Sequence, residues 1–189
     1  MAPFARSDAY DRARILAEAT RAQGKRRRRK AIALYRRVLT VEPENAELHA
    51  RLAPLLAETG QWFDALQSFR QAAEGYLRSG RPERAVAAYR EAARHLPREV
   101  EVWRAIGELQ RAQGRNREAI QALLEGRRQF RSRELRPQAI YLLRRVREID
   151  PGHVDATLDL ARELARNRQA DESSLILQAL AARASGRTL

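Results

Sequence analysis

The sequence predicts an all-α fold in which antiparallel helices follow one another in a repeating array. Between residues 52 and 97, large apolar residues and alanines recur at helical spacing, and a glycine or a proline closes each run. Gly60 and Gly114 lie 54 residues apart. The same separation divides three prolines, Pro43, Pro97 and Pro151. A helical unit of 54 residues therefore repeats along the chain.

Comparing residues 43–96 with residues 97–150 places core positions on core positions. Leu52 matches Ile106, and Phe69 matches Leu123. A third copy starts at residue 151 and stops before its last helix. The N-terminal part supplies only the end of a unit, because its apolar residues match the last helix of the first copy; they are Ala31, Tyr35 and Val38.

The first helix is predicted to begin at Ser7 and Asp8, which are good N-cap residues, and to run to about Gln23. Gly24 is expected to stop it. Its predicted packed face consists of four residues, Ala13, Leu16, Ala17 and Thr20.

A run of six cations follows Gly24. Because like charges repel, this run is expected to stay solvated and to lengthen the turn by about two residues relative to the turn at Gly60. The second helix is then predicted to start near Arg29.

The third helix is predicted to begin after Asn45, a good cap, and to kink at Pro54 in its interior. A long helix over residues 62–79 fits the pattern of the second helix of one hairpin and also that of the first helix of the next. The unit therefore has three helices. Pro82 and Pro137 fit the first turns of later helices.

The pattern in residues 46–79 resembles the tetratricopeptide repeat, a 34-residue pair of antiparallel helices. The residues that carry the resemblance are Leu52, Ala53, Leu56, Gly60, Ala65, Phe69 and Ala72. The resemblance covers roughly residues 10–182 and implies a right-handed α-solenoid of about ten antiparallel helices. This family is a scaffold used by many pathways, so the resemblance implies partner binding and leaves the partner open.

The length suits one repeat domain, predicted over residues 8–184, with a disordered segment over 1–7 and a frayed tail over 185–189. The period directs the large aromatic residues inward, so we expect them in the core: Trp62, Phe69, Tyr76, Tyr89 and Trp103. No apolar segment reaches the length of a signal peptide core or of a membrane span, and we expect a cytoplasmic protein.

The formal net charge of +13 is unevenly distributed: +8 over residues 1–42, 0 over 43–96, +5 over 97–150 and 0 over 151–189. An acidic or polyanionic partner would explain this distribution. A GC-rich genome is the alternative explanation, because only two of the 37 basic residues are lysines.

Nothing in the sequence predicts catalysis. There are no cysteines, and the three histidines, His49, His95 and His153, have no partners at metal-ligand spacing. Gly-rich phosphate loops are also absent. The sequence therefore predicts a non-enzymatic protein without a metal or a cofactor, in which His49 is half-buried and the other two can cap helix ends.

The resemblance implies a concave groove lined by the first helix of each pair. Carried over by position, it holds several charged residues, and arginines suit the capture of carboxylates. The predicted partner-binding residues are Arg51, Arg70, Arg104, Glu108, Arg111, Arg128, Arg131, Leu158, Arg162 and Arg166. The preferred hypothesis is a scaffold that binds an acidic or amphipathic segment of another protein, with Arg104, Arg111, Arg128 and Arg131 as the strongest candidates.

Two alternatives remain open. One is binding of a polyanion, either nucleic acid or an anionic surface, by the basic run Lys25, Arg26, Arg27, Arg28, Arg29 and Lys30. We expect no exposed aromatic residue to interleave with this run, which argues against polyanion binding. The other is a structural subunit of a homo- or hetero-oligomer, because the last helix leaves four apolar residues without cover: Leu175, Ile176, Leu177 and Leu180.

Overall fold

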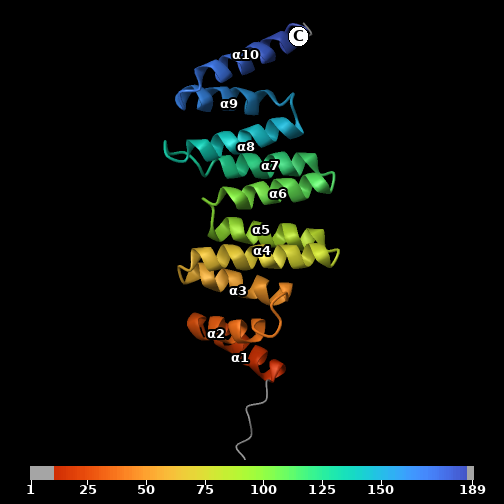
Figure 1. Ribbon diagram of the computed structural model, residues 1–189, viewed down its shortest axis with the longest axis vertical. Coiled ribbons are helices and arrows are strands. Elements are labelled where there is room, and N and C mark those ends of the chain that lie inside the picture. Colours follow the sequence, from red (N-terminus) through yellow and green to blue (C-terminus); the bar gives the residue numbers. More distant parts are fainter. Residues whose placement is uncertain (1–10, 187–189) are drawn as a thin grey trace, which may run out of the picture. The chain divides into compact units, whose positions relative to one another are not determined.

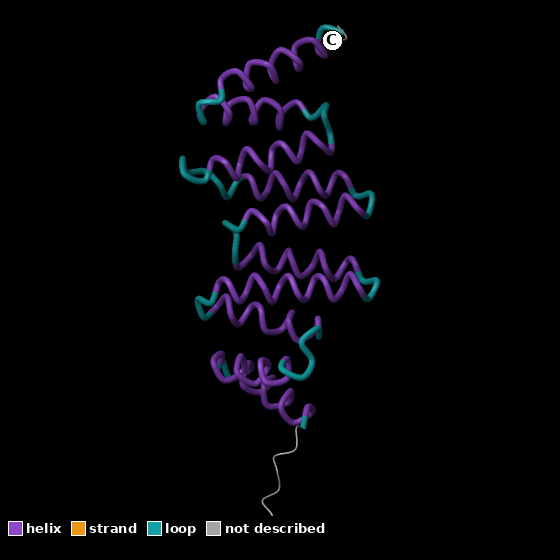
Figure 2. Tube along the Cα trace, viewed as in Figure 1, coloured by secondary structure: helices purple, strands orange, loops and turns teal. Residues whose placement is uncertain are grey.

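The computed structural model describes residues 11–186, which contain ten α-helices and no strand (Figures 1 and 2). The helices are α1 (Arg12–Gly24), α2 (Arg28–Leu39), α3 (Ala46–Glu58), α4 (Trp62–Arg78), α5 (Pro82–His95), α6 (Val100–Ala112), α7 (Asn116–Arg127), α8 (Arg136–Ile149), α9 (Val154–Arg166) and α10 (Ala170–Ala184). The predicted all-α class is confirmed.

The chain divides after His95 into two compact units, unit 1 with α1–α5 and unit 2 with α6–α10. In each unit every helix packs against the next one along the chain, as in an α-solenoid. Such a fold buries its core between neighbouring helices and needs no contacts between distant parts of the sequence.

The predicted three-helix repeat is confirmed by the packing inside each unit. Besides the consecutive pairs, α3 contacts α5 in unit 1 and α6 contacts α8 in unit 2. Equivalent helices also begin 54 residues apart: α3, α6 and α9 begin at Ala46, Val100 and Val154. The last copy comprises only α9 and α10 within the described residues.

Small residues let the helices approach closely, as the alanine and glycine pattern predicts. A Cβ atom added to Gly75 would lie 2.7 Å from Ala46 Cβ, and one added to Gly126 would lie 2.6 Å from Trp103 Cβ. Larger side chains fill the space between these contacts: Phe69, Leu123 and Leu143 are almost fully buried.

The start of α1 differs from the prediction. Residues 7 and 8 lie outside the described residues, and Asp11 caps the helix by accepting a hydrogen bond from the Arg14 amide at 3.0 Å. The buried face consists of Ile15, Ala19 and Ala22, so the predicted face at Ala13, Leu16, Ala17 and Thr20 was wrong. Extending the 34-residue pattern back from Ala31 places Ala53 and Leu56 on Ala19 and Ala22, two of the three buried residues.

The turn between α1 and α2 was also predicted incorrectly. It comprises Lys25, Arg26 and Arg27, three residues like the turn at Gly60. Gly24 is the last residue of α1, and the residue with positive φ is Arg26 at 55°. The helix runs through to Gly24 because the residue that adopts the left-handed conformation after its end is Arg26, two residues later.

Other boundary predictions hold. The Asn45 side chain caps α3 by accepting from the Leu48 amide at 3.2 Å, and α3 runs through Pro54 as one helix. His153 caps α9 by accepting from the Ala156 amide at 3.3 Å.

Among the aromatic residues expected in the core, four are buried: Phe69, Tyr76, Tyr89 and Trp103. Trp62 is 55% exposed, so its predicted core position was wrong. It is the first residue of α4, where the chain has only just left the turn at Gly60.

No helix among residues 11–186 has the length and apolar character needed to cross a membrane. The predicted segment 1–7 and most of the predicted tail 185–189 lie outside the described residues, and the boundaries of a single domain over 8–184 stay a prediction. Helix α10 ends at Ala184.

Candidate functional site

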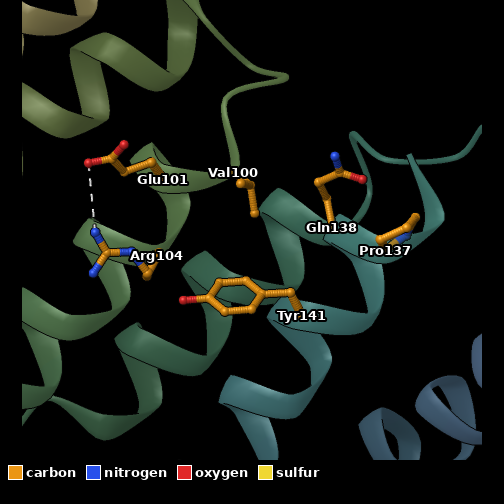
Figure 3. A pocket seen from close by; sticks show the side chains of 6 residues that line it. All are labelled: Val100, Glu101, Arg104, Pro137, Gln138 and Tyr141. Carbon is orange, nitrogen blue, oxygen red and sulfur yellow. Dashed lines mark ion pairs between the residues drawn. The ribbon is translucent and has the colours of Figure 1, made fainter. Parts of the chain in front are cut away.

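An open groove of about 460 Å³ lies between α6 and α8 in unit 2 (Figure 3). Three of its lining residues come from the first turns of α6, and three come from the first turns of α8. They are Val100, Glu101 and Arg104 on α6, and Pro137, Gln138 and Tyr141 on α8. Pro137 fits there because the first turn of a helix needs no amide hydrogen at that position.

The charges on the groove wall are paired with one another. Arg104 Nη1 donates to Glu108 Oε2 at 2.6 Å, and Arg104 Nη2 lies 3.7 Å from Glu101 Oε1. Arg145 on α8 donates to Glu108 Oε1 at 2.9 Å and to Glu148 Oε2 at 2.5 Å. The wall therefore carries alternating charges rather than one sign.

Arg104 is held in its charged form by this network. Burial opposes the charge, but the hydrogen bond and charge of Glu108 outweigh it, with smaller contributions from Tyr141 and Glu101, and they raise the pKa of Arg104. The guanidinium is thus positioned before any ligand arrives, which lowers the entropy cost of using it in recognition.

The rest of the groove is apolar, with one unsatisfied polar atom. Val100, Pro137 and the ring of Tyr141 line it, and Figure 3 shows Tyr141 extending from α8 toward Arg104. The side-chain oxygen of Gln138 is buried and has no hydrogen-bond partner among the described residues.

Unit 1 has a groove at the equivalent place, between α3 and α5, of about 260 Å³. Two of its lining residues are held by Glu47, whose carboxylate accepts from the Tyr76 hydroxyl at 3.1 Å and from Arg84. The guanidinium groups of Arg81 and Arg84 lie 5.2 and 5.0 Å from the Tyr76 ring centroid. Burial, followed by the charge and hydrogen bond of Glu47, raises the pKa of Tyr76. These contacts leave the unit 1 groove the smaller of the two.

The structure brings three predicted partner-binding residues together on α6, namely Arg104, Glu108 and Arg111, beside Arg145 of α8. Within residues 11–186, Arg111 has no ion pair within 4.0 Å. Sequence reasoning missed Val100, Pro137, Gln138, Tyr141 and Arg145. The available signal was the three-helix unit, which makes the third helix face the first.

The predicted positions of Arg128 and Arg131 on a long second helix were wrong. Helix α7 ends at Arg127, Arg128 caps it, and Arg131 lies in the loop before α8, where its Nε donates to the Arg128 carbonyl at 3.0 Å. Near the end of α7, Gly126 stands where the first copy has Ala72, and a Cβ atom added there would lie 2.6 Å from Trp103 Cβ.

The remaining predicted residues are on other helices. Leu158, Arg162 and Arg166 are on α9, where Arg162 pairs with Asp159 at 3.1 Å and Arg166 pairs with Glu163 at 3.4 Å. Arg51 lies on α3 and Arg70 on α4, both in unit 1. The partner-binding role of these residues stays a prediction.

The basic run forms the turn between α1 and α2 and the first residues of α2. Arg28 pairs with Glu58, and Lys30 Nζ lies 2.6 Å from Glu18 Oε1. The other four cations of the run, Lys25, Arg26, Arg27 and Arg29, are exposed. No aromatic residue interleaves with the run itself, and the exposed Trp62 and Phe63 begin α4, after the turn that follows Glu58.

On α10, two of the four residues predicted to lack cover are exposed: Leu175 at 65% and Leu177 at 42%. Leu180 is half-buried. Ile176 is buried, so its prediction was wrong; each exposed leucine lies about 100° around the helix from it.

The histidines do not form a metal site. Among the described residues, no three His, Cys, Asp or Glu side chains lie close enough together to hold a metal ion. His49 is half-buried, as predicted, and its Nε2 lies 2.8 Å from the Pro43 carbonyl. His95 stacks on Phe69 with ring centroids 6.3 Å apart.

Comparison with known proteins agrees with the repeat pattern. A tetratricopeptide repeat family model matches residues 16–76 and 71–134, and a second one matches residues 135–187. No curated protein matches the chain.

Several solved structures are similar to this chain. A putative kinesin light chain from Podosopora anserina with nearly identical TPR-like repeats shares 19% identity over 93% of this chain and 98% of its own, with a TM-score of 0.43. YrrB, described as a TPR protein with an unusual peptide-binding site, shares 14% over 90% and 85%, with a TM-score of 0.34. MamA shares 15% over 94% and 96%, with a TM-score of 0.34. These TM-scores do not decide the arrangement of the helices or the partner.

Proposed function

Because the chain belongs to the tetratricopeptide repeat family, whose members are scaffolds for protein interaction, we propose that it is a non-catalytic scaffold that binds an amphipathic segment of a partner protein in the α6–α8 groove. The observation that carries the proposal is the composition of this groove. An apolar strip of Val100, Pro137 and Tyr141 lies beside paired charges and an unsatisfied amide oxygen.

The charge pairing favours an amphipathic partner over a strongly acidic one. Arg104 lies between Glu101 and Glu108, so an acidic ligand would have to displace an existing carboxylate. An apolar side chain packed on Tyr141 gains buried area without that exchange. Arg111 has no ion pair within the described part of the chain. It is therefore available to pair with one acidic residue at the end of the partner segment.

Site-specific photo-crosslinking in the native host tests the proposal. A photoreactive residue is placed at Gln138, inside the groove, and in a matched protein at Arg117, which is exposed on α7. We expect a covalent adduct with another protein only from position 138, and the crosslinked peptide should alternate apolar and charged residues. Adducts of equal yield from both positions, or none from 138, would contradict the proposal.

Groove variants then give the affinity of the identified segment. Tyr141→Ala removes the largest apolar contact and should weaken binding about tenfold or more. The double variant Arg104→Glu with Arg111→Glu separates the two kinds of partner: an amphipathic segment should lose less affinity from it than from Tyr141→Ala, whereas a strongly acidic segment should lose more.

The exposed face of α10 favours a second interaction surface, which would take a helix of another chain. Leu177 is 42% exposed, whereas the equivalent residues of the complete copies, Phe69 and Leu123, are 1% and 2% exposed beneath α5 and α8. A covering helix would occupy the place of a third helix. In unit 1 that helix supplies Arg84 to Glu47, and Asp155 is the matching acid on α9.

A synthetic peptide of residues 81–96, which is the chain's own third helix, is the probe for this surface. We expect it to bind, and Asp155→Lys should weaken binding while Asp155→Lys with Arg84→Glu in the peptide restores it. Light scattering of the free protein identifies self-association, in which case the partner helix belongs to a second copy. Binding unaffected by the charge reversal rejects this surface.

A further inference from the structure

Two neighbouring turns on one edge of unit 1 combine cations with exposed aromatic rings. The turn between α1 and α2 contains Lys25, Arg26 and Arg27, and the turn between α3 and α4 is followed at once by Trp62 and Phe63. Both turns lie on the same side of the unit in Figure 1. An ion pair between Arg28 and Glu58 joins them.

The aromatic pair is unusually open to solvent. Trp62 is 55% exposed and Phe63 is 73% exposed, the highest value among the large apolar side chains of the described residues. Within unit 1 the other exposed large apolar residues, Val41 and Leu77, are not aromatic. Two adjacent rings exposed at a turn are not explained by the packing of the array, which buries Ala65 and Phe69 on the same helix.

The acids near the two turns are already neutralised. Glu58 pairs with Arg28, Glu18 pairs with Lys30, and Asp64 accepts a hydrogen bond from Arg36. Four cations have no ion pair within 4.0 Å in the described part of the chain, and all are exposed: Lys25, Arg26, Arg27 and Arg29. The edge therefore presents unpaired cations at one turn and exposed aromatic rings after the other.

The geometry of the rings favours a lipid surface over nucleic acid. Successive residues of an α-helix point about 100° apart. Trp62 and Phe63 are the first two residues of α4, so they cannot both lie along one track of stacked bases. A bilayer interface has no such track, and it accepts tryptophan and phenylalanine at the level of the headgroups while anionic headgroups attract the cations.

We propose that this edge of unit 1 docks peripherally on the surface of an anionic phospholipid bilayer. Trp62 and Phe63 enter the interface, and Lys25, Arg26, Arg27 and Arg29 contact headgroup phosphates. Two weak signals of different kinds, one apolar and one electrostatic, are together sufficient for stable but reversible membrane association. The proposal is independent of the α6–α8 groove, which lies in unit 2.

Co-sedimentation of the full chain with vesicles tests the proposal. Vesicles of phosphatidylcholine alone are compared with vesicles in which part of it is replaced by phosphatidylglycerol. We expect binding only to the anionic vesicles, weakening as salt is raised. Equal binding to both kinds of vesicle, or no binding to either, overturns the proposal.

Matched variants identify the residues. Lys25→Gln with Arg27→Gln removes two cations and should weaken binding roughly twentyfold. Arg98→Gln with Arg117→Gln makes the same change of net charge on exposed residues of unit 2 and should leave most of the binding. Equal losses from the two double variants would show that only total charge matters, and would overturn the proposed site.

The apolar contribution is tested in the same way. Trp62→Ser with Phe63→Ser should weaken vesicle binding about tenfold or more, whereas Val41→Ser with Leu77→Ser should have little effect. In a Trp103→Phe background, Trp62 is the only tryptophan, and its emission should shift to the blue on anionic vesicles. A titration with single-stranded RNA is run in parallel. A blue shift with RNA and none with vesicles would identify nucleic acid as the ligand of this edge and overturn the proposal.

Discussion

Two arginines occupy turn positions at which this chain otherwise uses glycine. Gly60, Gly80 and Gly114 end helices with φ of 78°, 67° and 74°, and Arg26 and Arg168 adopt φ of 55° and 62° at the equivalent places. A side chain in this left-handed region costs about 1 kcal/mol relative to glycine, because Cβ approaches the following carbonyl group. The fold tolerates this strain because the turn geometry is set by the helices on either side.

Replacing such an arginine by glycine should stabilise the protein. We expect Arg168→Gly to raise the free energy of unfolding by about 0.5–1 kcal/mol, since relief of the strain exceeds the extra freedom that glycine gives the unfolded chain. Gly114→Arg is the matched reverse change and should lower it by a similar amount. Urea unfolding measures both, and a loss of stability in Arg168→Gly would contradict the account.

Gly126 is required for a different reason, the close approach of α7 to Trp103. Its added Cβ would lie 2.6 Å from Trp103 Cβ, so Gly126→Ala forces the indole or the helix to move. We expect a loss of about 1–3 kcal/mol in unfolding free energy, together with a change in the fluorescence of Trp103.

Gly24→Ala is the matched control for Gly126→Ala. It is also a glycine in the last turn of a helix, but an added Cβ would meet nothing within 4 Å. We expect no loss of stability from it, and alanine's better helix propensity should add a few tenths of a kcal/mol. Equal effects of the two substitutions in urea unfolding would mean that contact with Trp103 is not the cause.

At the scale of the helices, the sequence was sufficient for the repeat but not for every boundary. The spacing of Pro43, Pro97 and Pro151 predicted the 54-residue period, because each proline follows the last helix of a unit. The early end of α7 was not predictable from that spacing, since the two copies have the same length although α4 ends at Arg78 and α7 ends at Arg127. A repeat period fixes where copies begin and carries no information on where a helix inside one copy stops.

The candidate groove was predicted in part for a related reason. The first helix of each pair was expected to line it, and Arg104 on α6 does so. Tyr141 and Gln138 were missed because the family pattern from which the groove was carried over has two helices per repeat, while the third helix forms the other wall here. The exposure of Trp62 was missed because helical spacing alone does not show which turn residues lie beyond the packed neighbours.

The Glu42 carboxylate, in the loop between α2 and α3, should make the stability of the protein depend on pH. Hydrogen bonds from Arg12 and Asn45 lower the pKa of Glu42 below its ordinary value of 4.5. The folded state therefore binds this proton less readily than the unfolded state. The stabilising contribution is complete above pH 4.5 and is lost as the pH falls through the lowered folded pKa.

Unfolding free energies measured from neutral pH down to acid conditions test this contribution. Glu42→Gln should reduce the acid-dependent part of the decline, because the amide has no proton to bind. Glu44→Gln removes the same charge from the same loop, where the side chain is 79% exposed, and serves as the control. An identical decline in the Glu42→Gln variant and the unmodified protein would show that Glu42 does not contribute.

At the scale of the whole chain, the stability of each repeat copy depends on how many neighbouring helices pack on its own helices. In unit 2, α7 packs between α6 and α8, whereas α10 packs chiefly on α9. In a repeat array, stability is approximately the sum of each element's own term and the terms at its interfaces with its neighbours. A helix with one packed neighbour thus has fewer interface terms than a helix with two, and it should open first.

Hydrogen exchange should detect this difference directly. We expect amides of α10 to exchange faster than those of the equivalent helix α7, because local opening of α10 exposes less apolar surface that was previously buried. Side-chain truncation should agree: Leu123→Ala, at 2% exposure, should cost about 2–5 kcal/mol, and Leu177→Ala, at 42%, well under half of that. If α10 is as strongly protected as α7 in the protein alone, then a second copy already covers Leu177, because α9 by itself leaves that face open; dilution should then remove the protection from α10 while leaving α7 unchanged.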